Sequence, residues 1–452
     1  MLDKFNVLLD KLDSISIPFL KSKEVKFLVL FGFIYRFILV LFYTTVTKYP
    51  DSGGFWELAD YLMNFDLSEY TGERSPGYPL LVFLGLGSNI LTVIYQFVLG
   101  VFTSVFWYKI ALNLNFKTQN ALWITLFLET FLHVFFYETA ILMESFSLFF
   151  FGVIFYYLTD SYFEKKSLKN EIVLSLLFGY LVLIKPFFAY IPFLIYAFSV
   201  IKNFSWRTFV NQKIVILIFP LVAYFGWSYV NKLNTGYFVS TSFLGLNISQ
   251  NCVYFAEKGP KEYKWIMEPY VKAREARIVS GEDVAMSVWQ AHYDELRYRY
   301  PYFPECSYHL GEYAKATIKN NLDDYFYQVI TKSWFDFWKV RIYWRYDEFN
   351  FKYANILFLV IWKIQGFILY ILKFSFLLLV PFYTFLFFKQ RKITPEIVIV
   401  AVVFAGSVLQ GLVTYGTNVK YSFPYEFLMI LTVFLFVKHF VKLPKDWNKF
   451  LQ

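Results

Sequence analysis

The chain of 452 residues is 58% hydrophobic and only 17% charged, and it contains 57 phenylalanines and 37 tyrosines. Soluble domains are nearer half apolar and a quarter charged, so this composition excludes an ordinary soluble protein. The formal net charge of +9 does not indicate nucleic-acid binding. The lysines and arginines cluster at the ends of apolar runs, as in membrane proteins, and form no basic stripe interleaved with aromatic residues.

The first 26 residues are mixed and amphipathic, and they lack the short apolar stretch and small-residue cleavage site of a secretory signal. We expect residues 1–26 to form a helix that lies on the cytoplasmic membrane surface.

Ten later segments are apolar and approach the length of about 20 residues that a membrane-spanning helix requires. The sequence therefore predicts an all-α polytopic membrane protein with about ten transmembrane helices, at residues 27–46, 88–108, 119–137, 141–159, 172–184, 187–201, 214–233, 367–388, 396–414 and 423–440. The fifth and sixth segments are short and meet at Lys185-Pro186. They form either two spans or one broken helix, and the polar, helix-breaking junction favours two.

Orientation follows from the basic residues in short loops. Twenty lysines and arginines fall in the segments assigned to the cytoplasm, against four in the short outer loops. Both termini are therefore expected in the cytoplasm. The N-terminal transmembrane module is then 27–233, with a long outer loop at 47–87. An extracytoplasmic cap with an interfacial helix follows at 234–366, and the C-terminal helices and tail occupy 367–452.

The cap is far more polar than the rest of the chain, and its pattern predicts helices at 262–279, 282–299, 308–320 and 323–338, followed by an interfacial helix at 354–366. Both cysteines, Cys252 and Cys306, fall in the cap. They form either a disulfide or two separate buried thiols, because sequence spacing does not give the Cα separation that a disulfide requires.

Charged residues inside apolar segments need partners. Arg36 lies in the first segment and Glu129 in the third, and we expect them to form a structural ion pair. The four histidines show no zinc-ligand spacing.

Polar clusters at the outer ends of the helices are the candidate sites. The first holds Asp51 and Glu57 and continues to Arg74-Ser75-Pro76-Gly77-Tyr78-Pro79. Asp51 is either the cap of a helix over 52–63 or a carboxylate that accepts a proton. Three further clusters follow, with Glu138 and Glu144 before the fourth span, Lys185 after the fifth, and Lys420-Tyr421 before the last.

These clusters resemble the polyprenyl-phosphate-dependent glycosyltransferases of the GT-C superfamily, which include protein O-mannosyltransferase-like and aminoarabinose-transferase-like enzymes. The resemblance implies that Asp51 acts as catalytic base or orients the acceptor, and that Glu144 is a second catalytic carboxylate. It is also compatible with a divalent cation at Asp51 and Glu144, and it implies substrate-binding roles for Arg74, Tyr78, Glu138, Lys185, Lys420, Tyr421 and Glu57. The Arg-Tyr-x-x-Pro signature of the superfamily is changed here, because Lys420 replaces the arginine and loses its two-pronged contact with phosphate.

The expected function is transfer of a sugar from a polyprenyl-phosphate donor to an extracytoplasmic glycan, lipid or protein, with inversion at the anomeric carbon. The chain has no P-loop and no Gly-x-Gly-x-x-Gly fingerprint, which disfavours a cytoplasmic nucleotide donor. A bacterial inner membrane is the expected location. The alternatives are a transporter or lipid flippase, and a polysaccharide polymerase or ligase that uses a lipid-linked oligosaccharide.

Overall fold

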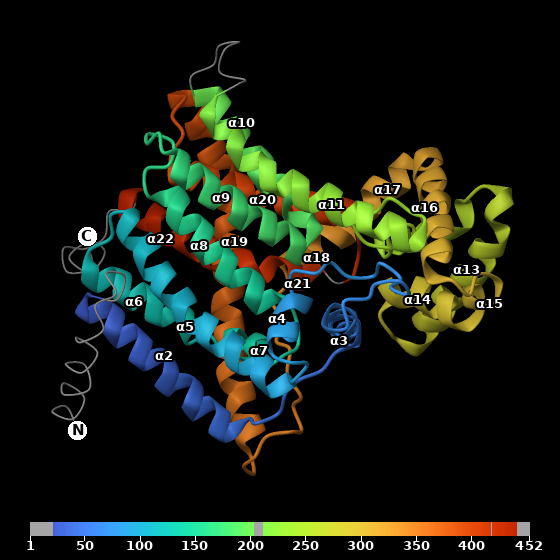
Figure 1. Cartoon of the computed structure of the whole chain (residues 1–452), viewed down its shortest axis with the longest axis horizontal. Coiled ribbons are helices and arrows are strands. Elements are labelled where there is room, and N and C mark those ends of the chain that lie inside the picture. The colour runs from blue at the N-terminus through green and yellow to red at the C-terminus, as the bar shows by residue number, and fades with distance from the viewer. Residues whose placement is uncertain (1–20, 203–210, 417, 441–452) are drawn as a thin grey trace.

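The computed structural model describes residues 21–202, 211–416 and 418–440 (Figure 1). Helices are the regular elements of this part of the chain, apart from one isolated bridge between Thr47 and Ala140. The expected all-α class is confirmed. The α-helices are α2 (Lys23–Phe42), α3 (Pro50–Met63), α4 (Pro79–Leu84), α5 (Asn89–Asn113), α6 (Thr118–Glu129), α7 (Leu132–Glu138), α8 (Glu144–Thr159), α9 (Leu168–Ile184), α10 (Tyr190–Lys202), α11 (Ile218–Thr235), α12 (Leu244–Gln250), α13 (Lys264–Ser280), α14 (Ser287–Ala291), α15 (Arg297–Arg299), α16 (Phe303–Asn320), α17 (Leu322–Gln328), α18 (Trp334–Trp338), α19 (Ala354–Gln390), α20 (Pro395–Val413), α21 (Asn418–Ser422) and α22 (Glu426–Phe440).

Six helical stretches in the described residues are long and apolar enough to cross a membrane, or seven if the bent pair α6–α7 is one span. They are Lys23–Phe42, Asn89–Asn113, Gln212–Thr235, Ala354–Gln390, Pro395–Val413 and Asn418–Phe440. The count of about ten is not confirmed. Each of the ten expected segments contains a helix, but α8, α9 and α10 have only 16, 17 and 13 residues. These lengths fall short of the roughly 20 residues that span a bilayer.

The third expected span is bent by 61° between α6 and α7. The cause is side-chain insertion at the break, one of the established origins of helix kinks. Gln365 from α19 accepts a hydrogen bond from the Leu132 N–H at 2.8 Å and donates to the Thr130 carbonyl at 2.7 Å. The Tyr35 hydroxyl donates to the same carbonyl at 3.0 Å. A hydropathy pattern does not predict these hydrogen bonds, because Gln365 and Tyr35 come from other helices.

The expected break between the fifth and sixth segments is present. Lys185 ends α9 in an extended conformation, with φ −152° and ψ 106°, and a 3₁₀ turn at Pro186–Ala189 leads into α10. Proline cannot continue the helix that precedes it, so the chain turns at this point. The side chain of Lys185 is thereby placed outside both helices.

Residues 354–366, expected as an interfacial helix, form the first part of α19, a continuous helix of 37 residues. At 1.5 Å per residue, α19 is about 55 Å long, well beyond a hydrocarbon core of about 30 Å. Its early residues Phe358 and Trp362 pack with Tyr43 and Phe136 in a buried cluster of their own. This packing continues the helix past the expected boundary.

The cap projects from one side of the helical bundle and contains α12 to α17 (Figure 1). It has its own buried core, which includes Leu246, Tyr270 and Leu310. The four expected cap helices are all present. However, 282–299 is divided among a 3₁₀ turn, α14, a π-helical turn and α15, and 323–338 is divided among α17, a second π-helical turn and α18. Cys252 and Cys306 are buried free thiols, so the alternative of two unpaired cysteines holds.

The expected amphipathic segment lies mostly outside the described residues, as does the C-terminal tail from residue 441.

The expected ion pair between Arg36 and Glu129 is present. Arg36 donates a hydrogen bond of 2.8 Å to Glu129, and it also donates two hydrogen bonds of 2.7 Å to Glu138. All three side chains are buried.

Candidate functional site

Asp51 lies in the first turn of α3, where the chain is fastened to the segment before α8. The Ser52 hydroxyl accepts from the Tyr49 N–H at 2.9 Å and donates to the Ile141 carbonyl at 2.8 Å. Thr47 forms two backbone hydrogen bonds with the neighbours of Ala140 in the isolated bridge. These bonds hold the starts of α3 and α8 together, and with them Asp51 and Glu144.

The carboxylate of Asp51 is held between two cations from distant parts of the chain. Arg74 Nη2 lies 3.0 Å from Oδ1, and Lys420 Nζ lies 2.8 Å from Oδ2. The Asp51 side chain is 40% exposed, whereas those of Arg74 and Lys420 are largely covered. Burial acts to raise the pKa of Asp51, but Lys420 and Arg74 outweigh it and hold the pKa well below the usual range.

Arg74 is positioned by aromatic rings on both sides. Its guanidinium carbon lies 4.9 Å from the centre of the Phe55 ring and 4.7 Å from that of Phe243. Gly54 makes room for it, because a Cβ there would lie 2.9 Å from the Arg74 Nε atom. The Tyr70 hydroxyl donates to the Arg74 carbonyl and accepts from its N–H. These contacts therefore hold the Arg74 guanidinium in place beside the Asp51 carboxylate.

Lys420 is carried by α21, whose start is fixed by hydrogen bonds to α18 and to the helical turn that precedes it. The Asn418 N–H donates to the Asp336 carboxylate at 2.9 Å, and its side-chain amide donates to the Ser333 carbonyl at 2.7 Å. Asn418 and Ser333 are fully buried. This anchoring places Lys420 beside Asp51, in the first turn of α3.

Beside this ion pair lies a second one formed by Glu144 and Lys185. Lys185 Nζ is 3.9 Å from Glu144 Oε1 and 3.0 Å from the centre of the Tyr421 ring. Both charged residues are buried, and Glu144 Oε2 has no hydrogen-bond partner among the described residues. Burial lowers the pKa of Lys185 to about 7, against the opposing effect of Glu144. Lys420 and Arg74 also lower the pKa of Lys185, whereas Asp51 raises it.

The structure thus brings together Asp51, Arg74, Glu144, Lys185, Lys420 and Tyr421, which we call the charged cluster.

Three other residues expected at the substrate are not members of the charged cluster. Glu138 is buried against Arg36, and Tyr78 is fully buried with its hydroxyl donating to Gln96 at 3.1 Å. Glu57 is exposed on α3 and takes no part in the Asp51 ion pairs. The substrate-binding roles of Glu138, Tyr78 and Glu57 stay predictions, and in this structure the side chains of Glu138 and Tyr78 are turned toward partners inside the protein.

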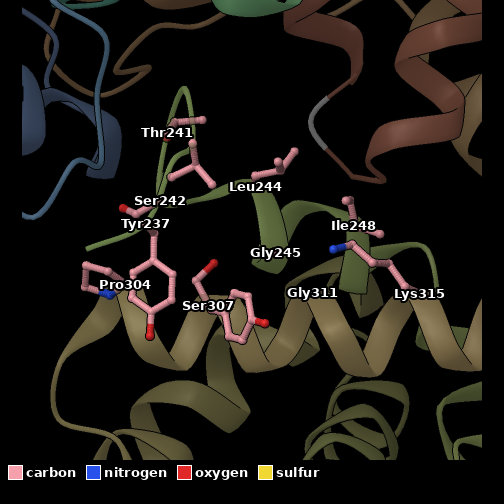
Figure 2. A pocket seen from close by; sticks show the side chains of 12 residues that line it. Tyr237, Thr241, Ser242, Leu244, Gly245, Ile248, Pro304, Ser307, Gly311 and Lys315 are labelled. Atoms are coloured by element: carbon pink, nitrogen blue, oxygen red, sulfur yellow. The ribbon is translucent and has the colours of Figure 1, made fainter. Parts of the chain in front are cut away.

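The loop that enters the cap lies directly against the Arg74 loop. The Thr241 hydroxyl donates to the Glu73 carbonyl at 2.7 Å, and the Ser242 N–H donates to the Gly72 carbonyl at 2.8 Å. Figure 2 shows this loop opposite α16, with Ser307 facing the small pocket of about 70 Å³ between them. The loop also supplies Phe243, which covers Arg74.

Sequence reasoning missed Phe243 and Tyr70, which orient Arg74. A short-range signal exists for Tyr70, since it lies four residues before Arg74. No comparable signal exists for Phe243. Among the described residues, no group of three or more histidine, cysteine or acidic side chains is arranged to hold a metal ion. A divalent cation at Asp51 and Glu144 stays a prediction, and each of these carboxylates already lies beside a lysine.

Comparison of the chain with protein families, curated protein sequences and solved structures finds no match in any of the three.

Proposed function

We propose that this protein is a membrane glycosyltransferase that moves a sugar from a polyprenyl-phosphate donor to a hydroxyl group of an extracytoplasmic acceptor. The observation that carries the proposal is the carboxylate of Asp51, partly exposed and held between Arg74 and Lys420. Sugar transfer to a hydroxyl needs a carboxylate to take the proton and cations to hold the departing phosphate.

In the proposed step, the acceptor oxygen attacks the anomeric carbon from the side opposite the phosphate. A carbon–oxygen bond forms as the bond between that carbon and the phosphate oxygen breaks, and the bonding pair leaves with the phosphate. The acceptor proton passes to Asp51. The product is inverted at the anomeric carbon, and no covalent enzyme intermediate forms.

The low pKa of Asp51 makes it a weak base while Lys420 and Arg74 are bound to it. A donor phosphate competes with Asp51 for these two cations. When the phosphate binds them, the pKa of Asp51 moves back toward its ordinary value, and the carboxylate becomes a better proton acceptor. The proposal therefore requires the donor to bind before the acceptor reacts.

The charge of the site suits a lipid phosphodiester. When all are ionised, Arg74, Lys185 and Lys420 against Asp51 and Glu144 give a formal charge of +1. A polyprenyl-phosphate sugar carries one negative charge. The Lys185 ammonium makes no hydrogen bond with any described residue, so its N–H groups are open to the phosphate or to the departing oxygen.

A transporter or flippase is the second candidate, and one observation favours it. Lys373, Glu426 and His133 form a buried ion network inside the bundle, with Glu426 3.1 Å from Lys373 and 2.7 Å from His133. Transporters place polar groups at this depth to bind substrates or protons. Every member of the network has a partner, which also fits a purely structural role.

The test is to add polyprenyl-phosphate-linked hexoses and pentoses to the purified full chain and measure free polyprenyl phosphate. A glycosyltransferase releases it, whereas a transporter releases none. Parallel samples with a chelator show whether a divalent cation takes part. A polymerase or ligase would instead release the lipid carrier from a lipid-linked oligosaccharide. If no donor yields free lipid phosphate, and vesicles containing the protein move lipid between leaflets, the proposed function is wrong.

A further inference from the structure

A helical segment at residues 322–338, where the cap meets the bundle, carries a stripe of exposed apolar side chains. It consists of α17, a π-helical turn at Val329–Ser333 and α18. The first of these helices belongs to the cap, and α18 packs against α20 in the bundle (Figure 1). Leu322, Phe326 and Ile330 are 52%, 48% and 57% exposed. Because they are four residues apart, they share one face of the segment.

The π-helical turn continues this stripe to Phe335 and directs Trp334 inward. A π-helix is wider than an α-helix and bonds residue i to i+5, so the next residue on the face of Ile330 is five positions later instead of four. Phe335 is 56% exposed. The Trp334 Nε1 atom donates to the Ser407 hydroxyl at 3.0 Å, and its ring centre lies 6.4 Å from that of Phe404. The segment therefore has an inner face packed on α20 and an apolar outer face.

The neighbouring candidate spans fix the level of the segment relative to a membrane. Helix α20 has 19 residues, or about 28 Å, and therefore needs its whole length to cross a hydrocarbon core of about 30 Å. Trp334 contacts it six and nine residues before its last residue, about 9 Å and 13 Å inside that end. On α19, Lys373 donates to the Lys339 carbonyl at 2.8 Å, at a point about 26 Å before the helix ends at Gln390. Both helices thus place the segment at the membrane boundary.

The lysines of the segment also fit a membrane surface. Lys332 Nζ lies 5.7 Å from the centre of the Tyr254 ring in the cap, and Lys339 Nζ lies 3.0 Å from Asp336 Oδ1. Both lysine side chains are exposed. A helix that lies in a membrane surface places its apolar side chains among the acyl chains and its lysine ammonium groups at the lipid headgroups.

We propose that residues 322–338 form an interfacial helix on the cap side of the membrane, with Phe326, Ile330 and Phe335 among the lipid acyl chains. Contact of these side chains with water is unfavourable, and the spans that hold the inner face bring the stripe to the lipid. This segment then fastens the cap to the membrane. It also holds the start of α21 through Ser333 and Asp336, so it sets the level of the charged cluster. The inference goes beyond the proposed transfer reaction and does not depend on it.

The test uses the full chain in phosphatidylcholine nanodiscs, with a nitroxide label on Phe326→Cys, Ile330→Cys or Phe335→Cys. Electron paramagnetic resonance measures collisions of the label with oxygen, which concentrates in hydrocarbon, and with a water-soluble nickel chelate. The matched control is Tyr298→Cys, at a 72% exposed residue of α15 in the cap, and Phe374→Cys on α19 is the lipid-facing reference. We expect the ratio of oxygen to nickel collisions in the stripe to exceed that of the control at least about fivefold, because water is excluded from the hydrocarbon core.

The native thiols Cys252 and Cys306 are buried, and the unaltered chain treated with the label measures their background. Ratios in the stripe equal to that of Tyr298→Cys would overturn the proposal, because the stripe would then lie in water. Low collision rates with both reagents would also overturn it, since a second copy of the chain or another protein surface would then cover the stripe. No sugar donor is present, so the result is independent of whether the protein transfers sugars.

Discussion

The carboxylate of Asp51 accepts a hydrogen bond of 2.8 Å from the ammonium of Lys420, a residue 369 positions later in the chain. The contact joins the first turn of α3 to the short helix α21 that precedes α22. It also leaves Asp51 partly exposed and ionised.

Replacement of Lys420 tests this pairing. We expect Lys420→Met to reduce the release of polyprenyl phosphate about 100-fold or more, because it removes a cation from the position where negative charge develops. Lys420→Arg retains the charge and should stay within about tenfold of the unaltered protein. Lys232→Met, at an exposed lysine on α11, is the matched control and should have no effect. Equal loss in the arginine and methionine variants would contradict a role for the charge.

Lys185 predicts a dependence on pH, since its pKa is about 7. An ammonium binds the donor phosphate and a neutral amine does not, so the KM for the donor should rise as the pH increases through about 7. Lys185→Arg stays protonated and should remove this dependence. A KM that rises with the same slope in the arginine variant would contradict the assignment.

The same group affects folding with a definite sign. Its pKa is about 7 in the folded protein and 10.5 ordinarily, so the unfolded chain binds more protons between these values. Stability should therefore rise with pH in this window, by at most about 1.4 kcal/mol per pH unit. Lys185→Met should flatten the change in the thermal unfolding midpoint from pH 7 to pH 10.

The buried group of Arg36, Glu129 and Glu138 is expected to be structural. Arg36→Met leaves two buried carboxylates without their cation and should destabilise the protein by about 3–5 kcal/mol. Glu138→Gln leaves a balanced pair and should cost much less. Thermal unfolding in detergent measures both. If Glu138→Gln abolished sugar transfer at unchanged stability, Glu138 would belong to the substrate site after all.

The cap depends on a close crossing of α12 and α16 at Gly245. A Cβ at this position would lie 1.7 Å from the Ser307 carbonyl oxygen, so the two backbones must separate in Gly245→Ala. We expect a loss of about 1–3 kcal/mol or more and faster proteolysis of the cap. Gly226→Ala on α11 is the control, because no atom lies within 4 Å of its Cβ position. Equal protease resistance in both variants would contradict the close crossing.

Much of the helical structure follows from the sequence, because apolar runs and breaks at Pro186 and Gly281 mark the ends of elements locally. The bend between α6 and α7 does not, since it depends on Gln365 from a distant helix. The continuity of α19 is also hidden, because Lys363 interrupts the apolar pattern while packing of Phe358 and Trp362 keeps the helix intact.

Part of the candidate site could be predicted from the sequence. Asp51, Arg74, Glu144, Lys185 and Lys420 were each expected at the outer helix ends, and the structure brings these residues together. Their partners were not predictable, because the pairing of Asp51 with Lys420 is set by tertiary packing. Tyr78 and Glu138 fit the same pattern of polar residues near the membrane surface, yet their side chains turn inward to Gln96 and Arg36.

The most direct test is the initial rate of polyprenyl phosphate release by the unaltered protein and by Asp51→Asn, each with a polyprenyl-phosphate sugar and checked first for equal thermal unfolding. Removing a positioned general base costs about 100-fold to 10,000-fold in rate. We predict that Asp51→Asn loses at least about 100-fold. A rate for Asp51→Asn within about twofold of the unaltered protein would contradict the assignment of Asp51 as the base.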